Sequence, residues 1–135
     1  MATLRLEIVT PEAKIYSEDV DMVTLPCVEG EMGIYPMHVP LMTQVLSGEV
    51  TARRGGADYH LAVGDGFVEI SADRVAIMTD MAIKSDDIDE AKAEEARKRA
   101  EVRLQEKLSD EEAASVTAAL AHSLAQLHVK RRNRR

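Results

Sequence analysis

The side chains in this chain that most often take part in catalysis or metal binding are four histidines and one cysteine. His122 and His128 are six residues apart, about 240° around a helix, so they would not share a helix face. No pair among the five has the spacing of a zinc site. The cysteine follows Pro26 without any surrounding motif, which fits a small apolar residue near a core. We therefore expect no metal centre and no catalytic nucleophile. The five residues are Cys27, His38, His60, His122 and His128.

Glycines and carboxylates give no stronger signal for catalysis. Gly64, Gly66 and Glu69 imitate part of a dinucleotide-binding fingerprint. The third glycine is missing, however, and the segment leads into a predicted strand where that fingerprint needs a helix. The sequence contains no phosphate-binding loop motif, and no pair of acidic residues is marked out for acid–base work. These observations predict a protein that is not an enzyme on its own.

A glycine- and proline-rich stretch at residues 29–43 stands out instead. Gly30 and Gly33 permit backbone angles that other residues avoid, whereas Pro36 and Pro40 fix φ and remove two amide donors. Several apolar side chains and one histidine accompany them, which suits a stiff, shaped loop that presents a docking surface. Two strands joined by a proline-rich turn are the alternative, and the residue types by themselves favour that alternative.

The segments around this stretch predict an all-β domain. Residues 4–8 alternate apolar and charged side chains, as in a half-buried strand. Residues 54–57 carry a Gly-Gly hairpin signal. Many short strands separated by polar turns favour a sandwich or barrel, which we assign to residues 1–84. The expected strands are at residues 4–8, 20–25, 45–46, 50–52, 59–63, 67–70 and 74–78, with Pro26 ending the second.

The composition changes at Ser85, because no glycine or proline follows it. Asp87 with Glu90, and Ser109 with Glu112, have the spacing of capping boxes and predict two helix starts. A short connection between these helices predicts an antiparallel hairpin over residues 85–135. The complete fold is then an all-β sandwich or barrel followed by an α-helical hairpin, α+β overall.

The hairpin is expected to be held weakly. Alanine dominates the apolar side of the first helix, and alanine methyls bury little area. The apolar stripe of the second helix is longer. The sequence therefore allows two alternatives, a hairpin that can open and a hairpin that stays permanently docked. The first set of apolar residues is Ile88, Ala91, Ala96, Ala100, Leu104 and Leu108; the second is Val116, Leu120, Leu124 and Leu127.

The net charge of −7 is distributed unevenly. Residues 1–85 hold six Lys/Arg against thirteen Asp/Glu, whereas residues 86–135 hold eleven of each. An acidic body argues against nucleic-acid binding. The basic tail follows the last apolar stripe residue, so we expect it to be solvent-exposed and to suit a partner with an acidic loop. The tail residues are Lys130, Arg131, Arg132, Arg134 and Arg135.

The expected environment follows from what the sequence lacks. A single cysteine cannot form an internal disulfide. No apolar run approaches the ~20 residues of a membrane-spanning helix, and the N-terminus has no export signal. We expect a soluble protein of a reducing compartment.

Residues 29–43 closely resemble the Gly-Glu-x-Gly-x-x-Pro-x-His-x-Pro-Leu signature of the epsilon subunit of F-type ATP synthase. The resemblance also covers residues 4–11, 64–67 and 87–91, in family order and at family length. Where this chain has Met37, the family more often has a small residue. The resemblance implies a non-catalytic rotor subunit whose β-sandwich binds the gamma subunit and the c-ring, with Glu31, Met37 and His38 at the c-ring.

The resemblance also implies an inhibitory role for the helices. In that family the hairpin can swing along gamma toward the catalytic alpha and beta subunits and inhibit ATP hydrolysis. The basic tail would then reach an acidic loop of the beta subunits. The expected location is peripheral, on the cytoplasmic face of a bacterial cell membrane, with a chloroplast thylakoid as the less favoured alternative.

Some bacterial relatives bind ATP through an Ile/Leu-Asp-x-x-Arg-Ala motif, which this chain matches in Ile88 and Asp89. Lys92 replaces the arginine and lacks its planar two-pronged contact with phosphate. Residues 110–129 contain no arginine to complete the site. We expect weak regulatory ATP binding at most, and no other cofactor. A stand-alone β-sandwich binding module with a helical dimerisation arm is the alternative function, and an enzyme subunit with its site at an interface is a third.

Overall fold

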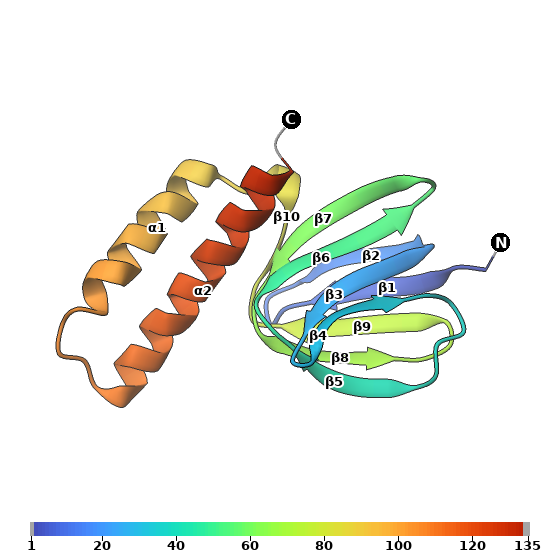
Figure 1. Cartoon of the computed structure of the whole chain (residues 1–135), viewed down its shortest axis with the longest axis horizontal. Coiled ribbons are helices and arrows are strands. Elements are labelled where there is room, and N and C mark those ends of the chain that lie inside the picture. Colours follow the sequence, from blue (N-terminus) through green and yellow to red (C-terminus); the bar gives the residue numbers. More distant parts are fainter. Residues whose placement is uncertain (1, 134–135) are drawn as a thin grey trace.

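Ten strands are followed by two α-helices in the computed structural model, which describes residues 2–133 (Figure 1). This arrangement confirms the predicted fold class. The strands are β1 (Leu4–Val9), β2 (Lys14–Val20), β3 (Met22–Cys27), β4 (Gly30–Ile34), β5 (Leu41–Val45), β6 (Gly48–Arg54), β7 (Ala57–Val63), β8 (Gly66–Ile70), β9 (Arg74–Thr79) and β10 (Ala82–Lys84). The helices are the 3₁₀ helix η1 (Ser85–Asp87), α1 (Glu90–Arg103) and α2 (Asp110–Arg132).

The strands form one continuous sheet that folds over itself into a sandwich (Figure 1). The strand order is β10-β7-β6-β3-β5-β8-β9-β1-β2. Strand β4 lies outside this order and pairs with β3. Strands β1 and β9 are parallel, and the other pairs are antiparallel. Strand β2 at one end of the order contacts β6 near the other end. The two layers therefore enclose a single core.

The core is almost entirely aliphatic, since the sequence has one phenylalanine, three tyrosines and no tryptophan. Leu6, Ile8 and Val23 are completely buried, and Tyr16 is the aromatic residue within the core. Cys27 is also buried, which confirms it as a small apolar core residue. Burial raises the pKa of the Cys27 thiol, so this side chain is a poor nucleophile.

Two strand predictions are corrected by tertiary contacts. The expected strand at residues 20–25 is divided between β2 and β3, because Asp21 turns the chain and its carboxylate accepts the Gly55 amide at 3.0 Å. Pro26 does not end the strand but lies within β3 and pairs with Glu31. Its carbonyl still accepts the Leu46 amide at 2.9 Å, so the missing proline N–H does not end pairing.

The glycine- and proline-rich stretch is two strands joined by a turn, so its interpretation as one stiff loop was wrong. Strand β4 pairs with β3, and β5 pairs with β8. The turn between them occupies residues 35–40. Met37 in this turn has φ 69, a left-handed conformation that is unfavourable for a side chain with a Cβ. The prolines thus shape a six-residue connection, and the glycines lie in the preceding strand.

The helices form the predicted antiparallel pair, with α2 against the sandwich and α1 on the far side of α2 (Figure 1). The Ser109–Glu112 capping box is confirmed. The predicted box at Asp87 is wrong, because Asp87 lies in η1 and the following Ile88 is extended. Asp89 is the N-cap of α1 instead, and its carboxylate accepts the Lys92 amide at 3.1 Å.

Gly66 is predicted to be essential for the packing of β8 on β9. A Cβ at this position would lie 1.9 Å from the Met78 carbonyl oxygen and 2.8 Å from the Thr79 Cα. Gly66→Ala should therefore lower the free energy of unfolding by about 3 kcal/mol, measured by urea denaturation. Gly33→Ala is the matched control, because its Cβ would meet only the Met22 side chain at 3.6 Å. A control as damaging as Gly66→Ala would contradict the steric explanation.

Candidate docking surface and helical arm

The turn predicted to contact a partner is strongly exposed. Met37 and Val39 are 78% and 71% exposed. The Met37 amide donates to the Ala72 carbonyl at 2.6 Å, which fixes the turn beside the β8–β9 connection. His38 is half-buried, with Nδ1 2.6 Å from the Val39 carbonyl oxygen. This turn therefore presents apolar side chains on a backbone held by hydrogen bonds.

Glu31 does not share this location. It lies near the start of β4, opposite Pro26, whereas the turn follows the end of that strand. Glu31 lines a groove between the sandwich and α2, together with Ser47 and His128. The structure therefore brings Met37 and His38 together but separates Glu31 from them.

An apolar patch on the outer face of β5, β8 and β9 was missed by sequence reasoning. Met42, Phe67 and Met78 are 64%, 57% and 42% exposed. Phe67 pairs directly with Met78, while Met42 on β5 pairs with Glu69 on β8. The three side chains lie on one face, because the buried residues of these strands alternate with them.

We define the docking face as Met42, Phe67 and Met78 on the strands together with Met37 and Val39 on the turn. Exposed apolar side chains in a group are typical of a protein-binding surface. Methionine adapts its shape to a partner, and an aromatic ring supplies a large contact area. The one signal in the sequence was that Phe67, the only phenylalanine of the chain, alternates in phase with the charged Glu69.

The helical arm, which comprises α1 and α2, is held to the sandwich by a small second core. Four buried residues form it, with Met81 and Ile83 packed against them. The predicted stripe on α2 is only partly correct, since Leu127 is buried but Leu124 is 48% exposed. Helix α2 has partners on two sides, so it buries two short stripes where one was predicted. The four buried residues of this second core are Ala62, Ile88, Ala125 and Val129.

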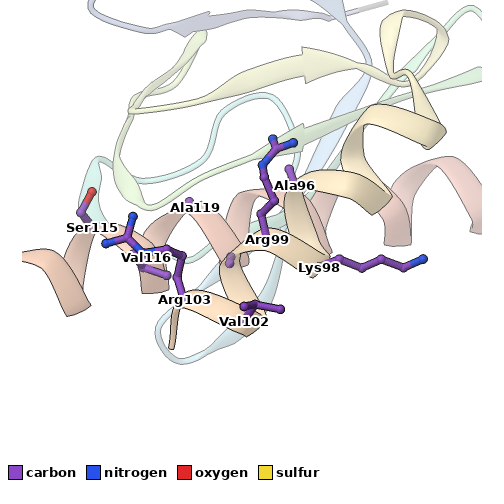
Figure 2. Close-up of a pocket in the computed structure, with 9 residues that line it drawn as sticks. Ala96, Lys98, Arg99, Val102, Arg103, Ser115, Val116 and Ala119 are labelled. Atoms are coloured by element: carbon purple, nitrogen blue, oxygen red, sulfur yellow. The ribbon is translucent and has the colours of Figure 1, made fainter. Parts of the chain in front are cut away.

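The seam between the two helices is open in the half that lies toward their connection. A groove of about 600 Å³ lies between them there, with alanine and valine side chains at its base and arginines beside it (Figure 2). Val102 next to it is 63% exposed. Incomplete burial agrees with the expectation of a weakly held alanine seam. The residues that line the groove include Ala96, Arg99, Ala100, Val116 and Ala119.

Arg131 and Arg132 of the basic tail are exposed as predicted, whereas Lys130 is partly buried. All three also have partners within the chain, which the sequence did not indicate. Arg131 reaches back to α1, where its Nε and Nη2 donate to Glu90 and Glu94 at 2.9 and 2.8 Å. Arg132 pairs with Glu49, and Lys130 donates to the Ser85 carbonyl at 3.2 Å. These cations therefore tie the end of α2 to α1 and to the sandwich. Arg134 and Arg135 lie outside the described residues.

The pKa of Glu94 is lowered by hydrogen bonds from Arg97 and then from Arg131. The part of this lowering that Arg131 causes stabilises the closed hairpin above the pH at which a free glutamate titrates, about 4.3. That stabilisation is lost as the pH falls through the lower value of the closed form. The contact of Arg131 with α1 is thus fully formed at neutral pH.

The residues of the ATP-binding motif already have structural contacts in this arrangement. Ile88 is buried in the second core, and the Asp89 carboxylate caps α1. Lys92 is exposed. A nucleotide would have to compete with the first two contacts.

Other site types find no support in residues 2–133. Within that range no three His, Cys, Asp or Glu side chains are grouped so that they could hold a metal ion. None of the helices described there is long and apolar enough to cross a membrane.

Comparison with known proteins gives a consistent result over the whole length. Residues 3–85 match the family model of the ATP synthase delta/epsilon chain β-sandwich domain, and residues 86–131 match that of its long α-helix domain. The chain is 43% identical over 136 residues to the ATP synthase epsilon chain of Dehalococcoides mccartyi, covering 100% of this chain and 97% of the relative. It is 42% identical to the epsilon chain of Herpetosiphon aurantiacus, covering 97% and 98%.

A solved structure shares the fold. It is a chain of the Euglena gracilis mitochondrial ATP synthase OSCP/F1/c-ring assembly, with a TM-score of 0.77 at 24% identity. The superposition covers 95% of the present chain and 81% of the other.

ATP is predicted to bind weakly. Lys92 offers one point charge, and Ile88 and Asp89 already have structural contacts. Calorimetry on the isolated chain should therefore give a Kd well above about 1 µM, that is, a binding free energy weaker than about −8 kcal/mol. Lys92→Arg should tighten binding, whereas Lys98→Arg on the same helix should not. Micromolar affinity of the unmodified chain would show that lysine is sufficient.

Proposed function

The chain belongs to the ATP synthase delta/epsilon chain family, and we propose from that premise that it is a non-catalytic rotor subunit of F-type ATP synthase. In this role it couples the c-ring to the catalytic head, and its helical arm inhibits ATP hydrolysis. The observation that carries the proposal is the docking face, a group of exposed apolar side chains on the rigid sandwich. Its place is peripheral, on the cytoplasmic face of a bacterial membrane.

The docking face supplies the contact with the rest of the rotor. Strand residues Met42, Phe67 and Met78 suit the gamma subunit, since a sheet face offers a flat apolar area flanked by Gln44 and Glu69. Turn residues Met37 and His38 suit the polar loops of the c-ring. Glu31 was assigned to the same contact by resemblance, but its place beside α2 favours a role near the arm.

The arm inhibits when it leaves the sandwich and its two helices separate, so that α2 reaches the alpha and beta subunits. Its second core contains two alanines among four residues, so docking buries little apolar area. Arg131 and Arg132 are paired inside the chain when the arm is docked. On the extended arm the same cations would pair with acidic groups of the catalytic head. The arm therefore exchanges one set of carboxylate partners for another, which keeps the two states close in free energy.

Substitution on the docking face should separate the two rotor contacts. Phe67→Asp places a charge at the centre of the proposed gamma contact and should reduce recovery with gamma at least about tenfold. The double change Met37→Asp with His38→Asp should weaken association with the c-ring and leave gamma binding intact. Pull-down with each partner, with circular dichroism to verify folding, gives the measurement.

Val102→Asp is the matched control, because Val102 is 63% exposed but lies on α1, away from the docking face. Equal recovery of gamma with Phe67→Asp and with Val102→Asp would remove the sheet face from the interface.

A second comparison tests the arm. Glu94→Gln removes a docked partner of Arg131 and keeps the basic tail, so it should favour the extended arm and lower the ATP hydrolysis rate of the assembled enzyme. Glu101→Gln is the control, because Glu101 pairs with Arg97 but not with Arg131. Arg131→Gln removes the tail charge in both states and should inhibit less than Glu94→Gln. Equal hydrolysis rates for Glu94→Gln and Glu101→Gln would contradict this role of Arg131.

A further inference from the structure

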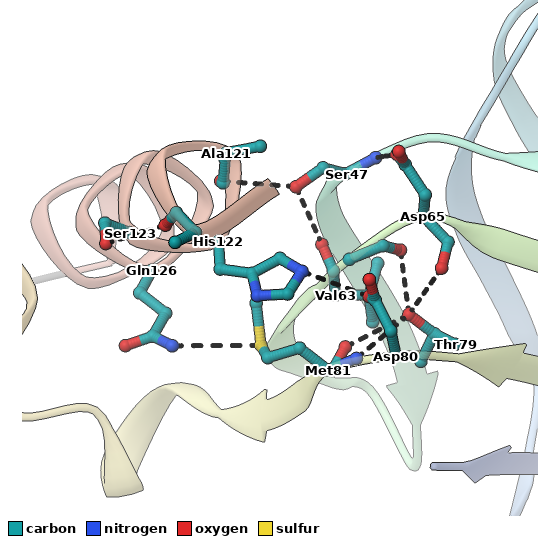
Figure 3. Close-up of polar contacts among 12 residues, drawn as sticks. Ser47, Val63, Asp65, Thr79, Asp80, Met81, Ala121, His122, Ser123 and Gln126 are labelled. Carbon is teal, nitrogen blue, oxygen red and sulfur yellow. Dashed lines mark hydrogen bonds and ion pairs between the residues drawn. The ribbon is translucent and has the colours of Figure 1, made fainter. Parts of the chain in front are cut away.

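The junction between α2 and the sandwich contains a histidine beside a carboxylate (Figure 3). His122 on α2 places Nε2 3.1 Å from Oδ1 of Asp80, which lies in the turn between β9 and β10. The side chains are 26% and 51% exposed, so solvent protons reach both. This contact exists only while the arm is docked, because its two members belong to the two parts that separate.

The chain leaves room for this contact through Gly64. A Cβ at that position would lie 2.0 Å from the Asp80 carboxylate and 2.8 Å from His122 Nε2. The backbone of Gly64 is also fixed, since its amide donates to the Met81 carbonyl and its carbonyl accepts the Thr79 hydroxyl, each at 2.8 Å. The glycine therefore lets carboxylate and imidazole meet over a rigid turn.

The other charged groups near His122 have contacts of their own. Asp65 directs its carboxylate to the Ser47 amide at 2.8 Å (Figure 3). Glu31 and Glu49 lie further along α2, at the groove lined by His128 and Arg132. Helix α1 directs Glu90 and Glu94 to Arg131, more than two turns further along α2. On α2 itself, Gln126 contacts the Met81 sulfur at 3.8 Å and carries no charge. Asp80 is thus the carboxylate in contact with the imidazole.

We propose that His122 and Asp80 form a proton-sensitive latch that strengthens docking of the arm as the pH falls through the imidazole range. This inference rests on the proposed function, in which the arm leaves the sandwich. An imidazole ordinarily titrates near pH 6.5. Once protonated it forms a charge pair with Asp80 in the docked state and faces water in the extended state. The added attraction is therefore present while the imidazole is protonated and absent when it is neutral.

A second histidine acts in the opposite direction. His60 on β7 lies 3.3 Å from Glu49, which is also the partner of Arg132 on α2. His60 stays on the sandwich in both states, so its protonation introduces a competitor for Glu49 and weakens the hold on Arg132. The pH response of the arm should therefore become steeper in His60→Gln, where only the His122 latch remains.

Thiol labelling of the full-length chain measures docking directly. Ala125→Cys introduces a thiol into the second core, at a site 6% exposed when the arm is docked. Cys27, buried inside the sandwich, reports complete unfolding in the same sample. The labelling rate is compared with and without His122→Gln at each pH, so that the intrinsic pH dependence of the reagent cancels.

At pH 5.5 the chain with His122 should label about twofold to fivefold more slowly than His122→Gln, as for an exposed ion pair. The two rates should converge by pH 8 and at high salt, where the pair is screened. Asp80→Asn should raise the labelling rate at pH 5.5 as His122→Gln does. The double variant should label no faster than His122→Gln alone.

A rate ratio that does not change with pH would overturn the latch while leaving the arm's mobility established. Labelling of the introduced thiol no faster than that of Cys27 at any pH would show that the arm does not leave the sandwich. That second result would overturn both the latch and the proposed inhibitory motion.

Discussion

Helix α2 is held on the sandwich by four buried side chains, and the behaviour of the C-terminal half depends on how little area they bury. Ala62 and Ala125 each contribute one methyl group, so Ile88 and Val129 supply most of the apolar contact. The N-terminal core, by contrast, is filled with completely buried leucine, isoleucine and valine. Apolar burial stabilises in proportion to area. One chain thus combines a firmly packed scaffold with an arm whose docking is marginal.

Polar contacts decide the position of an arm held in this way. The Ser47 hydroxyl donates to the Ala121 carbonyl at 3.3 Å, and Arg132 pairs with Glu49, whose side chain is 7% exposed. Such contacts are individually modest and sensitive to protons and salt. An arm fixed mainly by a large apolar interface would not respond to these conditions. The small second core is therefore the physical basis of both the proposed inhibitory motion and the proposed proton latch.

The docking face is also built on rigid elements. Phe67 and Met78 pair across β8 and β9 on a rigid sheet, so their positions do not depend on a loop. Met37 has a left-handed backbone conformation, and its amide donates to the Ala72 carbonyl, which fixes the turn. A partner can then be bound without ordering a flexible segment, which reduces the entropic cost of association.

Local chemistry in the sequence determined the fold class, the Gly55–Gly56 hairpin and the start of α2 at its Ser109 cap, because each depends on residues within a few positions of one another. Cys27 was likewise recognisable as an apolar residue. The tertiary structure decided what local patterns leave open. An alternating strand such as β8 does not reveal which face is covered, so the exposure of Phe67 appeared only with the packed sheets. Asp89, and not Asp87, caps α1, and Ile88 just before it is buried in the second core, a contact that the local pattern does not reveal. The partners of Arg131 and Arg132 lie 37 to 83 residues away in sequence, and only the docked helix brings these charges together.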